Sequence, residues 1–283
     1  MTEQEIKQLN RIHDVVLEMS SFFVTFCREN GLLCYLCGGG CIGAVRHGGF
    51  IPWDDDLDFF MPREDYERLK SVWRDDERYV MAFPSEHYND HNMFMTLRDR
   101  RTTMIKDYQK DLDIVHGISV DIFPLDGCPS STLRRIDQLL WGSIYQLYCS
   151  QMVPVNHGRV IRIAGDVLLA AVPSGRMRYL IWNHAEKRMS RFRIKDCNYI
   201  TEICAGPKYM FKRYPQKAFE AALYLPFENT TMPVPKGYDE YLRIAFGDYM
   251  KLPPEEQRVP PHTAILTDTE KPYGRIQEGT LNG

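Results

Sequence analysis

Three aspartates stand where the sequence predicts apolar strands, and such aspartates can hold a metal ion. Asp56 and Asp58 flank Leu57 at the start of an apolar run, and Asp121 lies inside the run ISVDIFP. Residues i and i+2 of a strand share a face, so the first two carboxylates would project together, with Cα atoms about 7 Å apart. They repel unless a cation lies between them, and Mg²⁺, with Mn²⁺ as a substitute, prefers such oxygen ligands. A charge inside an apolar strand needs a partner, so Asp121 is a candidate third ligand or general base.

A run of three glycines precedes this acidic cluster by about fifteen residues. Gly38, Gly39 and Gly40 follow the apolar run 32–37. We predict a turn there, or a close backbone approach, whose N–H groups hold donor phosphates. The run lacks the Gly-Lys-Ser/Thr ending of a P-loop and does not fit Gly-x-Gly-x-x-Gly. Glycines followed by Asp-x-Asp favour metal-assisted attack on phosphorus, in which cations neutralise the phosphate and position the reacting groups.

Several residues between the glycines and the aspartates allow two interpretations each. Arg46 would clamp a donor phosphate or form an ion pair with Asp54 or Asp55. His47 would act as a general acid or base, or pack as a hydrogen-bonding histidine. Trp53 would stack on a base or on a choline ammonium, or anchor the loop. For Asp54 and Asp55 we expect loop hydrogen bonds rather than direct ligation, with Asp55 kept as a further candidate site residue.

Candidate site residues also lie outside this block. Arg98 belongs to the stretch TLRDRRTTM. Lys208 and Lys212 are candidates for binding a donor phosphate or an anionic acceptor. His262 follows a proline-rich segment and would close over the site. The aromatic residues of the last third would suit a quaternary ammonium or a sugar ring, although we expect most of them in the core.

Hydrophobic periodicity predicts the elements that position these side chains. Residues 2–29 carry apolar side chains at steps of three and four, which indicates a long helix ending at Asn30-Gly31. Apolar runs predict strands at 32–37, 57–61, 79–83, 93–98 and 118–123. Further helices are predicted at 62–73, 130–153, 159–172, 174–192 and 236–246. The pattern indicates an α/β (α+β) fold with a mixed sheet core.

Length and composition are those of a globular protein. The chain has 283 residues, 44% hydrophobic and 26% charged, with a net charge of −3. These values exclude fibrous and disordered classes and argue against a nucleic-acid partner. We expect a core over residues 1–128 and a mainly helical part over 129–283 that completes the substrate site, or both integrated into one domain.

The cysteines and the apolar runs indicate a cytoplasmic protein. We expect all eight cysteines to be free, buried thiols rather than disulfides. Cys34, Cys37 and Cys41 suggest zinc, but no fourth ligand stands at the usual spacing. We predict no membrane-spanning helix and no signal peptide, and therefore a cytoplasmic location or one at the inner face of the membrane.

One segment carries a local excess of positive charge. Residues 176–217 contain eleven Lys/Arg and three Asp/Glu. Such a segment would bind phosphates, an anionic glycan or a membrane surface, or it is a solvated helix face. The nearby apolar stretch 160–172 is too short to span a bilayer. It would lie on a membrane carrying a lipid-linked acceptor, or pack within a helical core.

Four stretches of the sequence together form a recognisable pattern that covers most of residues 30–262: CGGGCIGAVRHGGFIPWDDDLDFFMPREDYERL, TLRDRRTTM, VDIFPLDG and VPKGYDEYLRIAFGDYMKLPP. In these stretches the chain resembles the LicD family of phosphotransferases, which is related to fukutin and fukutin-related protein. This resemblance implies a nucleotidyltransferase-like fold. It also implies transfer of a phospho-alcohol, such as phosphocholine, from a CDP-linked donor to a cell-surface glycan precursor of the lipopolysaccharide or teichoic acid kind.

The resemblance also implies roles for individual positions. Asp56 and Asp58 match the metal-binding Asp-x-Asp of the family, and Asp121 matches its third acidic position. The family's glycines fall on Gly39 and Gly43, and its Arg-His pair falls on Arg46 and His47. CDP-choline is the donor that we expect, with a glycan or lipid-linked acceptor.

Two other functions remain open. The same carboxylates would serve a nucleotidyltransferase that acts on a small alcohol or an antibiotic. Alternatively, the fold would serve a non-catalytic nucleotide or glycan binder, although all three candidate carboxylates are present.

Overall fold

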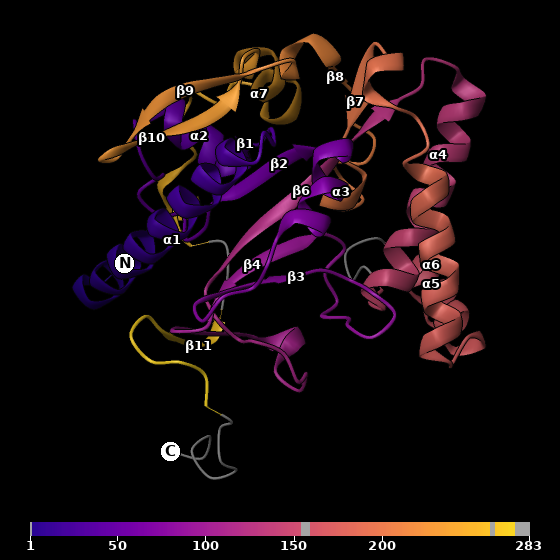
Figure 1. Ribbon diagram of the computed structural model, residues 1–283, viewed down its shortest axis with the longest axis horizontal. Coiled ribbons are helices and arrows are strands. Elements are labelled where there is room, and N and C mark those ends of the chain that lie inside the picture. The colour runs from indigo at the N-terminus through magenta and orange to yellow at the C-terminus, as the bar shows by residue number, and fades with distance from the viewer. Residues whose placement is uncertain (1, 154–158, 261–263, 275–283) are drawn as a thin grey trace.

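The computed structural model describes residues 2–153, 159–260 and 264–274, and its centre is a mixed β-sheet (Figure 1). Within these residues five strands lie in the order β1–β2–β6–β4–β3, and β7 and β8 continue the sheet from β6. β2 and β6 run parallel, whereas the other pairs run antiparallel. The strands are β1 (Tyr35–Cys37), β2 (Asp58–Pro62), β3 (Tyr79–Ala82), β4 (Met95–Asp99), β6 (Ser119–Cys128), β7 (Tyr199–Thr201) and β8 (Tyr214–Pro215). The predicted mixed α/β class is confirmed.

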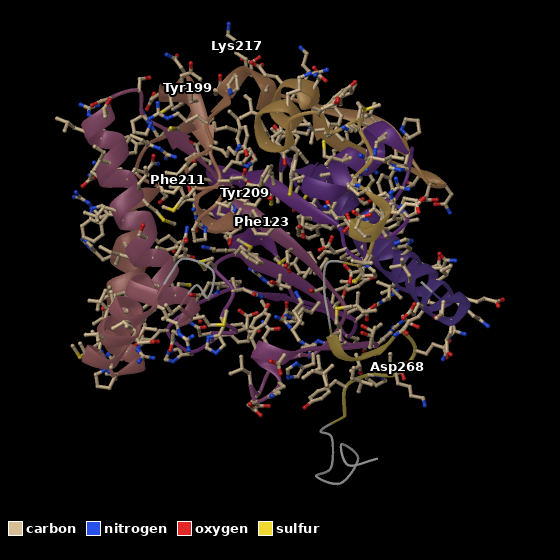
Figure 2. The ribbon with its side chains drawn as sticks, turned by 180° about the vertical axis from the view of Figure 1, so that it is seen from behind. Phe123, Tyr199, Tyr209, Phe211, Lys217 and Asp268 are labelled. Carbon is tan, nitrogen blue, oxygen red and sulfur yellow. The ribbon has the colours of Figure 1, made fainter. Side chains whose placement is uncertain are left out.

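Strand β6 joins the two halves of the chain. Its first part pairs with β2 and β4, and its last three residues pair with β7. Two further strand pairs lie outside this sheet: β9 (Ala222–Phe227) with β10 (Thr230–Pro235), and β5 (Thr103–Lys106) with β11 (Ala264–Asp268). In Figure 2, Tyr199 and Lys217 lie at one end of the molecule and Asp268 lies towards the opposite end. The sheet and its extensions therefore run along most of the molecule.

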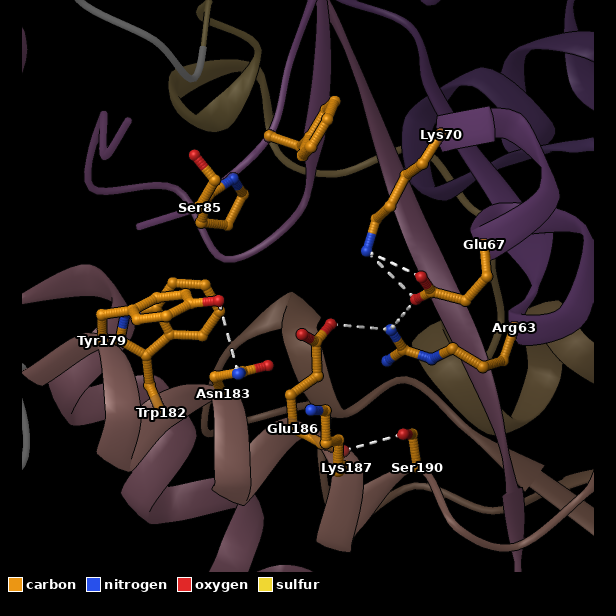
Figure 3. A pocket seen from close by; sticks show the side chains of 12 residues that line it. Arg63, Glu67, Lys70, Ser85, Tyr179, Trp182, Asn183, Glu186, Lys187 and Ser190 are labelled. Carbon is orange, nitrogen blue, oxygen red and sulfur yellow. Dashed lines mark hydrogen bonds and ion pairs between the residues drawn. The ribbon is translucent and has the colours of Figure 1, made fainter. Parts of the chain in front are cut away.

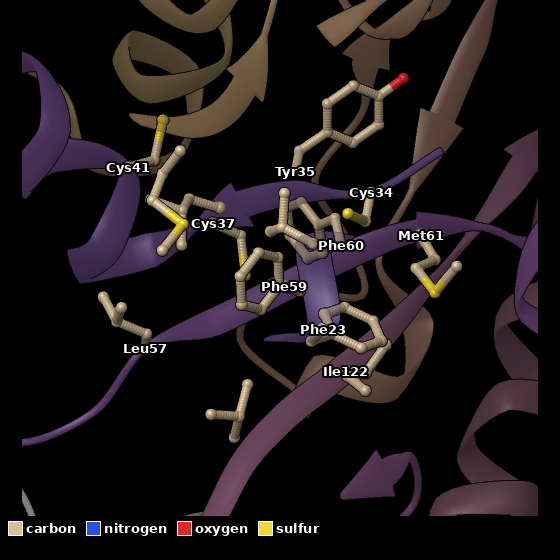
Figure 4. Packing of buried hydrophobic residues seen from close by; sticks show 14 of the residues in the cluster. Phe23, Cys34, Tyr35, Cys37, Cys41, Leu57, Phe59, Phe60, Met61 and Ile122 are labelled. Atoms are coloured by element: carbon tan, nitrogen blue, oxygen red, sulfur yellow. The ribbon is translucent and has the colours of Figure 1, made fainter. Parts of the chain in front are cut away.

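Helix α1 (Glu3–Glu29) covers one face of the sheet. It begins with a capping box, in which the Glu5 N–H donates to the Thr2 hydroxyl and the Thr2 N–H donates to the Glu5 carboxylate. Its apolar side chains recur at helical spacing and are buried. Phe23 packs edge-to-face on Phe59 of β2, with ring centres 5.1 Å apart (Figure 4). The helix ends at Asn30, and Gly31 takes the left-handed conformation (φ +60°) that favours glycine.

The other face of the sheet is covered by the C-terminal part of the chain. Phe60 of β2 packs against Phe219 and against Tyr241 of helix α7 (Tyr238–Phe246), with ring centres 6.3 and 5.6 Å away. Tyr35 of β1 donates a hydrogen bond to the carbonyl of Phe219. One apolar core therefore draws on residues from both halves of the chain. The division at residue 128 remains a prediction.

Three helices form a layer along one side of the molecule, opposite α1 (Figure 1). They are α4 (Thr132–Ser150), α5 (Arg159–Ala171) and α6 (Gly175–Met189). α4 and α6 enclose a second apolar cluster that includes Tyr145, Trp182 and Met189. No helix in the described part of the chain has the length and apolar character that crossing a membrane requires.

The predicted elements fall where the sequence places them, whereas α2 (Gly38–Arg46), β5 and β7–β11 were not predicted and the three glycines do not form a turn. The six predicted helices and five predicted strands are confirmed to within a few residues at their ends. Gly38, Gly39 and Gly40 instead form the first turn of helix α2, with α3 (Arg63–Val72) following later. The predicted turn is therefore wrong, but the alternative prediction of a close approach to the backbone is confirmed, because a Cβ on Gly39 would overlap the Asp54 carboxylate. A Cβ on Gly40 would meet Leu57 and Leu36 at 3.0 and 3.3 Å.

All eight cysteines are free thiols, and all except Cys197 are buried. This confirms the predicted free thiols. Among the described residues, Cys34, Cys37 and Cys41 do not come together as a group that could hold a metal ion. Burial raises the pKa of the Cys37 and Cys41 thiols, so both stay protonated at neutral pH.

A buried ion pair links β6 to helix α3. The guanidinium of Arg63 donates to both carboxylate oxygens of Asp126, over 2.8 and 2.9 Å. Its third nitrogen donates to Glu186 of α6 over 3.0 Å (Figure 3). These residues adjoin a cavity of 370 Å³ that is lined from both sides by α3 and α6. The pair therefore ties the sheet and the helical layer together.

Removing the charge of Asp126 should destabilise the protein strongly. Asp126→Asn keeps the shape but leaves a buried guanidinium with one charge fewer around it, so the free energy of unfolding should fall by about 3 kcal/mol. Asp239→Asn is the matched control, since Asp239 pairs with Arg243 on the surface, and it should cost about 0.5 kcal/mol. Urea unfolding monitored by circular dichroism measures both. Equal losses would show that the buried pair has no special role.

Glu202 is a buried carboxyl group beside β7. Tyr214 of β8 donates a hydrogen bond to its Oε1. Burial raises the pKa of Glu202 to about 8 from an ordinary value of 4.5, against smaller opposing effects of Tyr214 and Lys212. Glu202 is therefore protonated in the folded protein at neutral pH.

Stability should fall as the pH rises from about 5 to 7.5. In this range the folded protein keeps a proton on Glu202 that the unfolded chain has lost, so a rise in pH favours unfolding, by up to about 1.4 kcal/mol per pH unit. Glu202→Gln, which has no proton to lose, should flatten this dependence in urea unfolding at pH 5.5, 6.5 and 7.5. Glu220→Gln changes an exposed glutamate and should leave the slope unchanged. A Glu202→Gln curve parallel to wild type would contradict the assignment.

Candidate active site

Asp58 and Asp121 lie side by side at the start of two parallel strands. Asp58 of β2 is the register partner of Asp121 of β6, so both side chains project from the same face of the sheet. Asp56 precedes Asp58 by two residues. Burial first, and then repulsion from Asp56 and Asp121, raise the pKa of Asp58 well above its usual range. The structure thus brings together the three aspartates selected from the sequence.

Lys106 is a fourth charged residue of this cluster, and the sequence reasoning missed it. Its Nζ lies 3.9 Å from Oδ2 of Asp121, and this carboxylate raises the pKa of Lys106. Lys106 ends strand β5, and its register partner on β11 is Ala264. Its one sequence signal is its place at the end of the apolar strand TMIK, two residues after the TLRDRRTTM block ends.

The cluster has the donor set that a divalent cation requires. Oδ1 of Asp121 is buried and has no hydrogen-bond partner among the described residues. One lysine faces three aspartates, so the group is left with excess negative charge and with carboxylate oxygens as donors. Hard cations such as Mg²⁺ prefer these donors. Asp56, Asp58 and Asp121 therefore fit the metal that the family resemblance implies.

The acidic loop before β2 holds a second grouping of carboxylates. Ligand atoms of Asp54, Asp55 and Asp56 lie within 4.8 Å of one another. The space that a Cβ on Gly39 would need is filled by the Asp54 carboxylate. Asp55 is buried. Asp56 thus belongs to both groupings, and the roles expected for Asp54 and Asp55 in the loop stay predictions.

The first turn of α2 lies directly beside Asp58. Cys37 is the register partner of Asp58, and α2 begins at the next residue with Gly38 in a left-handed conformation (φ +51°). The Gly38 N–H donates to the hydroxyl of Tyr241 over 3.0 Å. A helix N-terminus carries partial positive charge and unpaired N–H groups, and it attracts anions. The predicted phosphate contact of Gly38, Gly39 and Gly40 is compatible with this place in the fold and remains a prediction.

Arg46 and His47 lie at the opposite end of α2 from the glycines. Eight residues of helix put Arg46 about 12 Å from Gly38 along the axis. Its guanidinium donates to the carbonyls of Tyr249 (2.6 Å) and Lys251 (3.5 Å). His47 accepts a hydrogen bond from Arg46 over 3.4 Å, and burial lowers its pKa. Arg46 thus binds backbone carbonyls in the C-terminal part of the chain. Binding of a donor phosphate by Arg46 stays a prediction.

Trp53 lines a cavity on the α1 side of the acidic loop. The guanidinium of Arg258 lies over its ring, 5.6 Å from the ring centre. The cavity has a volume of 530 Å³ and is also lined by His13, Phe50 and Glu228. His13 Nε2 lies 2.6 Å from the carbonyl oxygen of Asp54. Both interpretations of Trp53 fit this position.

Arg98 is buried on the same face of the sheet as Asp121. Thr96 is the β4 register partner of Asp121, and Arg98 follows it by two residues. The guanidinium donates to Asp90 over 2.6 Å and to the Val115 carbonyl over 3.0 Å. Asp90 also accepts from Asn92 over 3.1 Å. Arg98 therefore joins Asp90 and the Val115 carbonyl in a buried hydrogen-bond network next to the carboxylate cluster. This network would help to position β4, whose Thr96 pairs with Asp121.

The remaining predicted residues lie in the C-terminal half. The Lys212 ammonium donates to the Ile244 carbonyl over 2.9 Å. Lys208 is exposed, with its ammonium 5.2 Å from the ring centre of Tyr209. His262 lies outside the described residues. Binding of phosphate by Lys208 and Lys212 stays a prediction.

Comparison with known proteins relates this site to one family. The family model LicD/FKTN/FKRP, nucleotidyltransferase domain, matches residues 31–134. This span contains Asp56, Asp58, Lys106 and Asp121.

Two curated proteins are similar to the chain. Lipopolysaccharide cholinephosphotransferase LicD of Haemophilus influenzae is 30% identical over 259 residues, which cover 88% of this chain and 93% of the relative. An uncharacterized protein of Rickettsia typhi, RT0683, is 27% identical over 117 residues, or 41% of this chain and 36% of that protein. The first similarity runs almost the full length of both proteins and includes both the carboxylates and the α7 region that contacts α2. With its carboxylate cluster inside the matched domain, the chain belongs to the LicD family.

Proposed function

We propose that this protein transfers a phospho-alcohol, phosphocholine in the first instance, from a CDP-linked donor to a hydroxyl of a cell-surface glycan or glycolipid precursor. The Haemophilus influenzae relative is named as a lipopolysaccharide cholinephosphotransferase, and the near full-length similarity supports a transferase of the same kind. The donor, the acceptor and the metal are the parts that we propose.

The observation that carries the proposal is the carboxylate cluster at the start of β2 and β6. Asp58 is the register partner of Asp121, and Asp56 also repels Asp58. Oδ1 of Asp121 has no hydrogen-bond partner among the described residues. The site therefore carries more negative charge than the surrounding groups balance. Such a site is arranged for a cation together with an anionic substrate. A carboxylate that serves the fold would lose stability when replaced, whereas a carboxylate held against repulsion for a ligand should gain it in the metal-free protein.

In the proposed reaction an acceptor hydroxyl oxygen attacks the phosphorus on the alcohol side of the CDP-alcohol. A new P–O bond forms, the bond to the CMP oxygen breaks, and CMP leaves with that electron pair. Asp56 and Asp58 would hold Mg²⁺, which supplies charge neutralisation for the phosphates. Asp121 would hold the metal or accept the hydroxyl proton. Lys106 limits the charge at Asp121, and the α2 N-terminus would face the donor phosphates.

Nucleotidyl transfer is the second candidate, because the matched family model is described as a nucleotidyltransferase domain. The same carboxylates would then direct attack on the phosphorus next to the nucleoside, and pyrophosphate would leave instead of CMP. The two reactions therefore differ in the released product.

Asp58→Asn should abolish turnover and stabilise the metal-free protein. The substitution removes repulsion within the cluster, so the thermal midpoint without metal should rise. Loss of metal-assisted charge stabilisation, worth several kcal/mol, should lower kcat about a thousandfold. Added Mg²⁺ should raise the midpoint of wild type but not of the variant.

Asp107→Asn, an exposed carboxylate, is the control and should change neither property. Near-normal turnover of Asp58→Asn would refute the metal-site assignment. A lower midpoint combined with lost turnover would instead indicate a structural carboxylate.

One donor of a panel should stabilise the protein only when Mg²⁺ is present. The panel is CDP-choline, CDP-ribitol, CDP-glycerol, CTP and ATP, and we expect CDP-choline to act. A ligand at ~100 times its Kd adds about 2.7 kcal/mol, enough to raise the midpoint by several degrees. Asp56→Ala should remove the shift. With an acceptor present, CMP should be released.

A Mg²⁺-dependent shift with CTP or ATP alone, followed by release of pyrophosphate, would favour nucleotidyl transfer. Binding without any released product would favour a non-catalytic binder. Either result would overturn the main proposal.

A further inference from the structure

Large apolar side chains are exposed across the helical layer of α4, α5 and α6. On α4 they lie opposite the buried side of the helix, and on α5 they lie opposite Leu169, which packs against the second apolar cluster. Seven of them are between 52% and 80% exposed: Leu133, Ile136, Leu140, Ile163, Val167, Met177 and Leu180. Isolated exposed leucines are common, but seven such side chains on three adjoining helices are not. We call this set the outer helical surface.

The residues of α4 form a stripe opposite its buried face. Leu133, Ile136 and Leu140 are spaced by three and four residues and so lie on one side of the helix. The buried Gln138 and Gly142 lie on the opposite side, towards the core. The stripe therefore points outward.

Contacts between the three helices place these side chains in one layer. Trp141 of α4 packs edge-to-face on His184 of α6, with ring centres 5.1 Å apart. The Tyr148 hydroxyl of α4 donates to the Leu168 carbonyl of α5 over 3.2 Å. Arg178 of α6 donates to the Leu169 carbonyl over 2.9 Å. α5 thus adjoins both other helices.

Positive charges accompany the outer helical surface. Arg134, Arg162, Arg176 and Lys187, the last at the rim of the cavity between α3 and α6, are exposed on the described parts of α4, α5 and α6, where Asp166 is the exposed acidic residue. Asp137 is half-buried and pairs with Arg191 over 2.7 Å, and Arg176 lies 3.6 Å from Glu86. The exposed charge is therefore predominantly positive around apolar side chains.

The combination of exposed apolar and basic side chains favours one kind of binding partner for the outer helical surface over others. A second copy of the same surface would bring like charges together. A nucleic acid would leave the leucines and isoleucines without an apolar partner. An anionic bilayer offers negative headgroups for the arginines and lysine, and acyl chains for the apolar side chains.

We propose that the outer helical surface docks the protein on an anionic lipid bilayer, with α4, α5 and α6 lying against the headgroups. The apolar side chains enter the boundary between headgroups and acyl chains, and the basic side chains contact lipid phosphates. This contact is peripheral and reversible. It lies apart from the carboxylate cluster and does not rest on the proposed transferase reaction.

Vesicle co-sedimentation of the full chain tests the proposal without an activity assay. Vesicles of phosphatidylglycerol and phosphatidylcholine (1:1) should bind the protein at least tenfold more tightly than vesicles of phosphatidylcholine alone. Raising the salt concentration should weaken binding, because salt screens the charges. Leu140→Glu with Val167→Glu, and separately Arg134→Glu with Arg162→Glu, should each lower binding to anionic vesicles at least tenfold.

The substitutions are chosen to leave the fold intact. All four positions are exposed, and Arg134 and Arg162 lie in the first turns of α4 and α5, where glutamate is favourable. Circular dichroism and the thermal midpoint verify folding of each variant. Val259→Glu with Ile265→Glu is the matched control, because both residues are exposed outside the layer, and it should bind like wild type.

Three outcomes would overturn the proposal. The first is failure of the wild-type chain to bind anionic vesicles at low salt. The second is an equal loss of binding in the control pair. The third is a dimer in sedimentation analysis that Leu140→Glu with Val167→Glu dissociates, which would assign the surface to a second copy.

Discussion

Repulsion among carboxylates at the start of β2 and β6 is the constraint on which the rest of the site depends. Asp58 and Asp121 cannot move apart, because they are register partners on hydrogen-bonded strands. Asp56 adds a third charge two residues away, and burial, followed by repulsion from Asp56 and Asp121, raises the pKa of Asp58. Such repulsion lowers the stability of the folded protein. The apolar core on the opposite face of the sheet, where Phe59 and Ile122 are fully buried, offsets this loss.

The surroundings of the cluster offset this repulsion from several directions. Lys106 contributes one positive charge, and the N-terminus of α2 contributes a partial one beside Asp58. Strand β6 fixes the cluster to the remainder of the molecule, because its far end carries Asp126, which holds Arg63 and, through it, Glu186. One strand thus connects the charged site with the ion pair that anchors the helical layer.

The sequence predicted the helices and the acidic triad well, because both leave local signals. Helical spacing marks α1, and a lone aspartate in an apolar strand marks Asp121. Lys106 left no such signal, since its approach to Asp121 depends on the pairing of β5 with β11. Arg46 adjoins the glycines in sequence, but helix α2 carries it to C-terminal carbonyls. At residues 38–40 the glycines suggested a turn where the chain begins α2, but the predicted close approach holds, because Cβ atoms on Gly39 and Gly40 would meet Asp54 and Leu57.

The hydrogen bond from Gly38 to Tyr241 has a consequence for how the protein is made. It joins residues 203 positions apart, as does the contact of Arg46 with Tyr249, and Tyr35 reaches Phe219 across 184 positions. During synthesis from the N-terminus, the acidic loop emerges long before the residues that brace α2 beside it. Contacts so distant in sequence form late. The segment 31–134 that the family model matches therefore completes its packing only with later residues, and a nascent chain would expose its charged cluster until α7 is made.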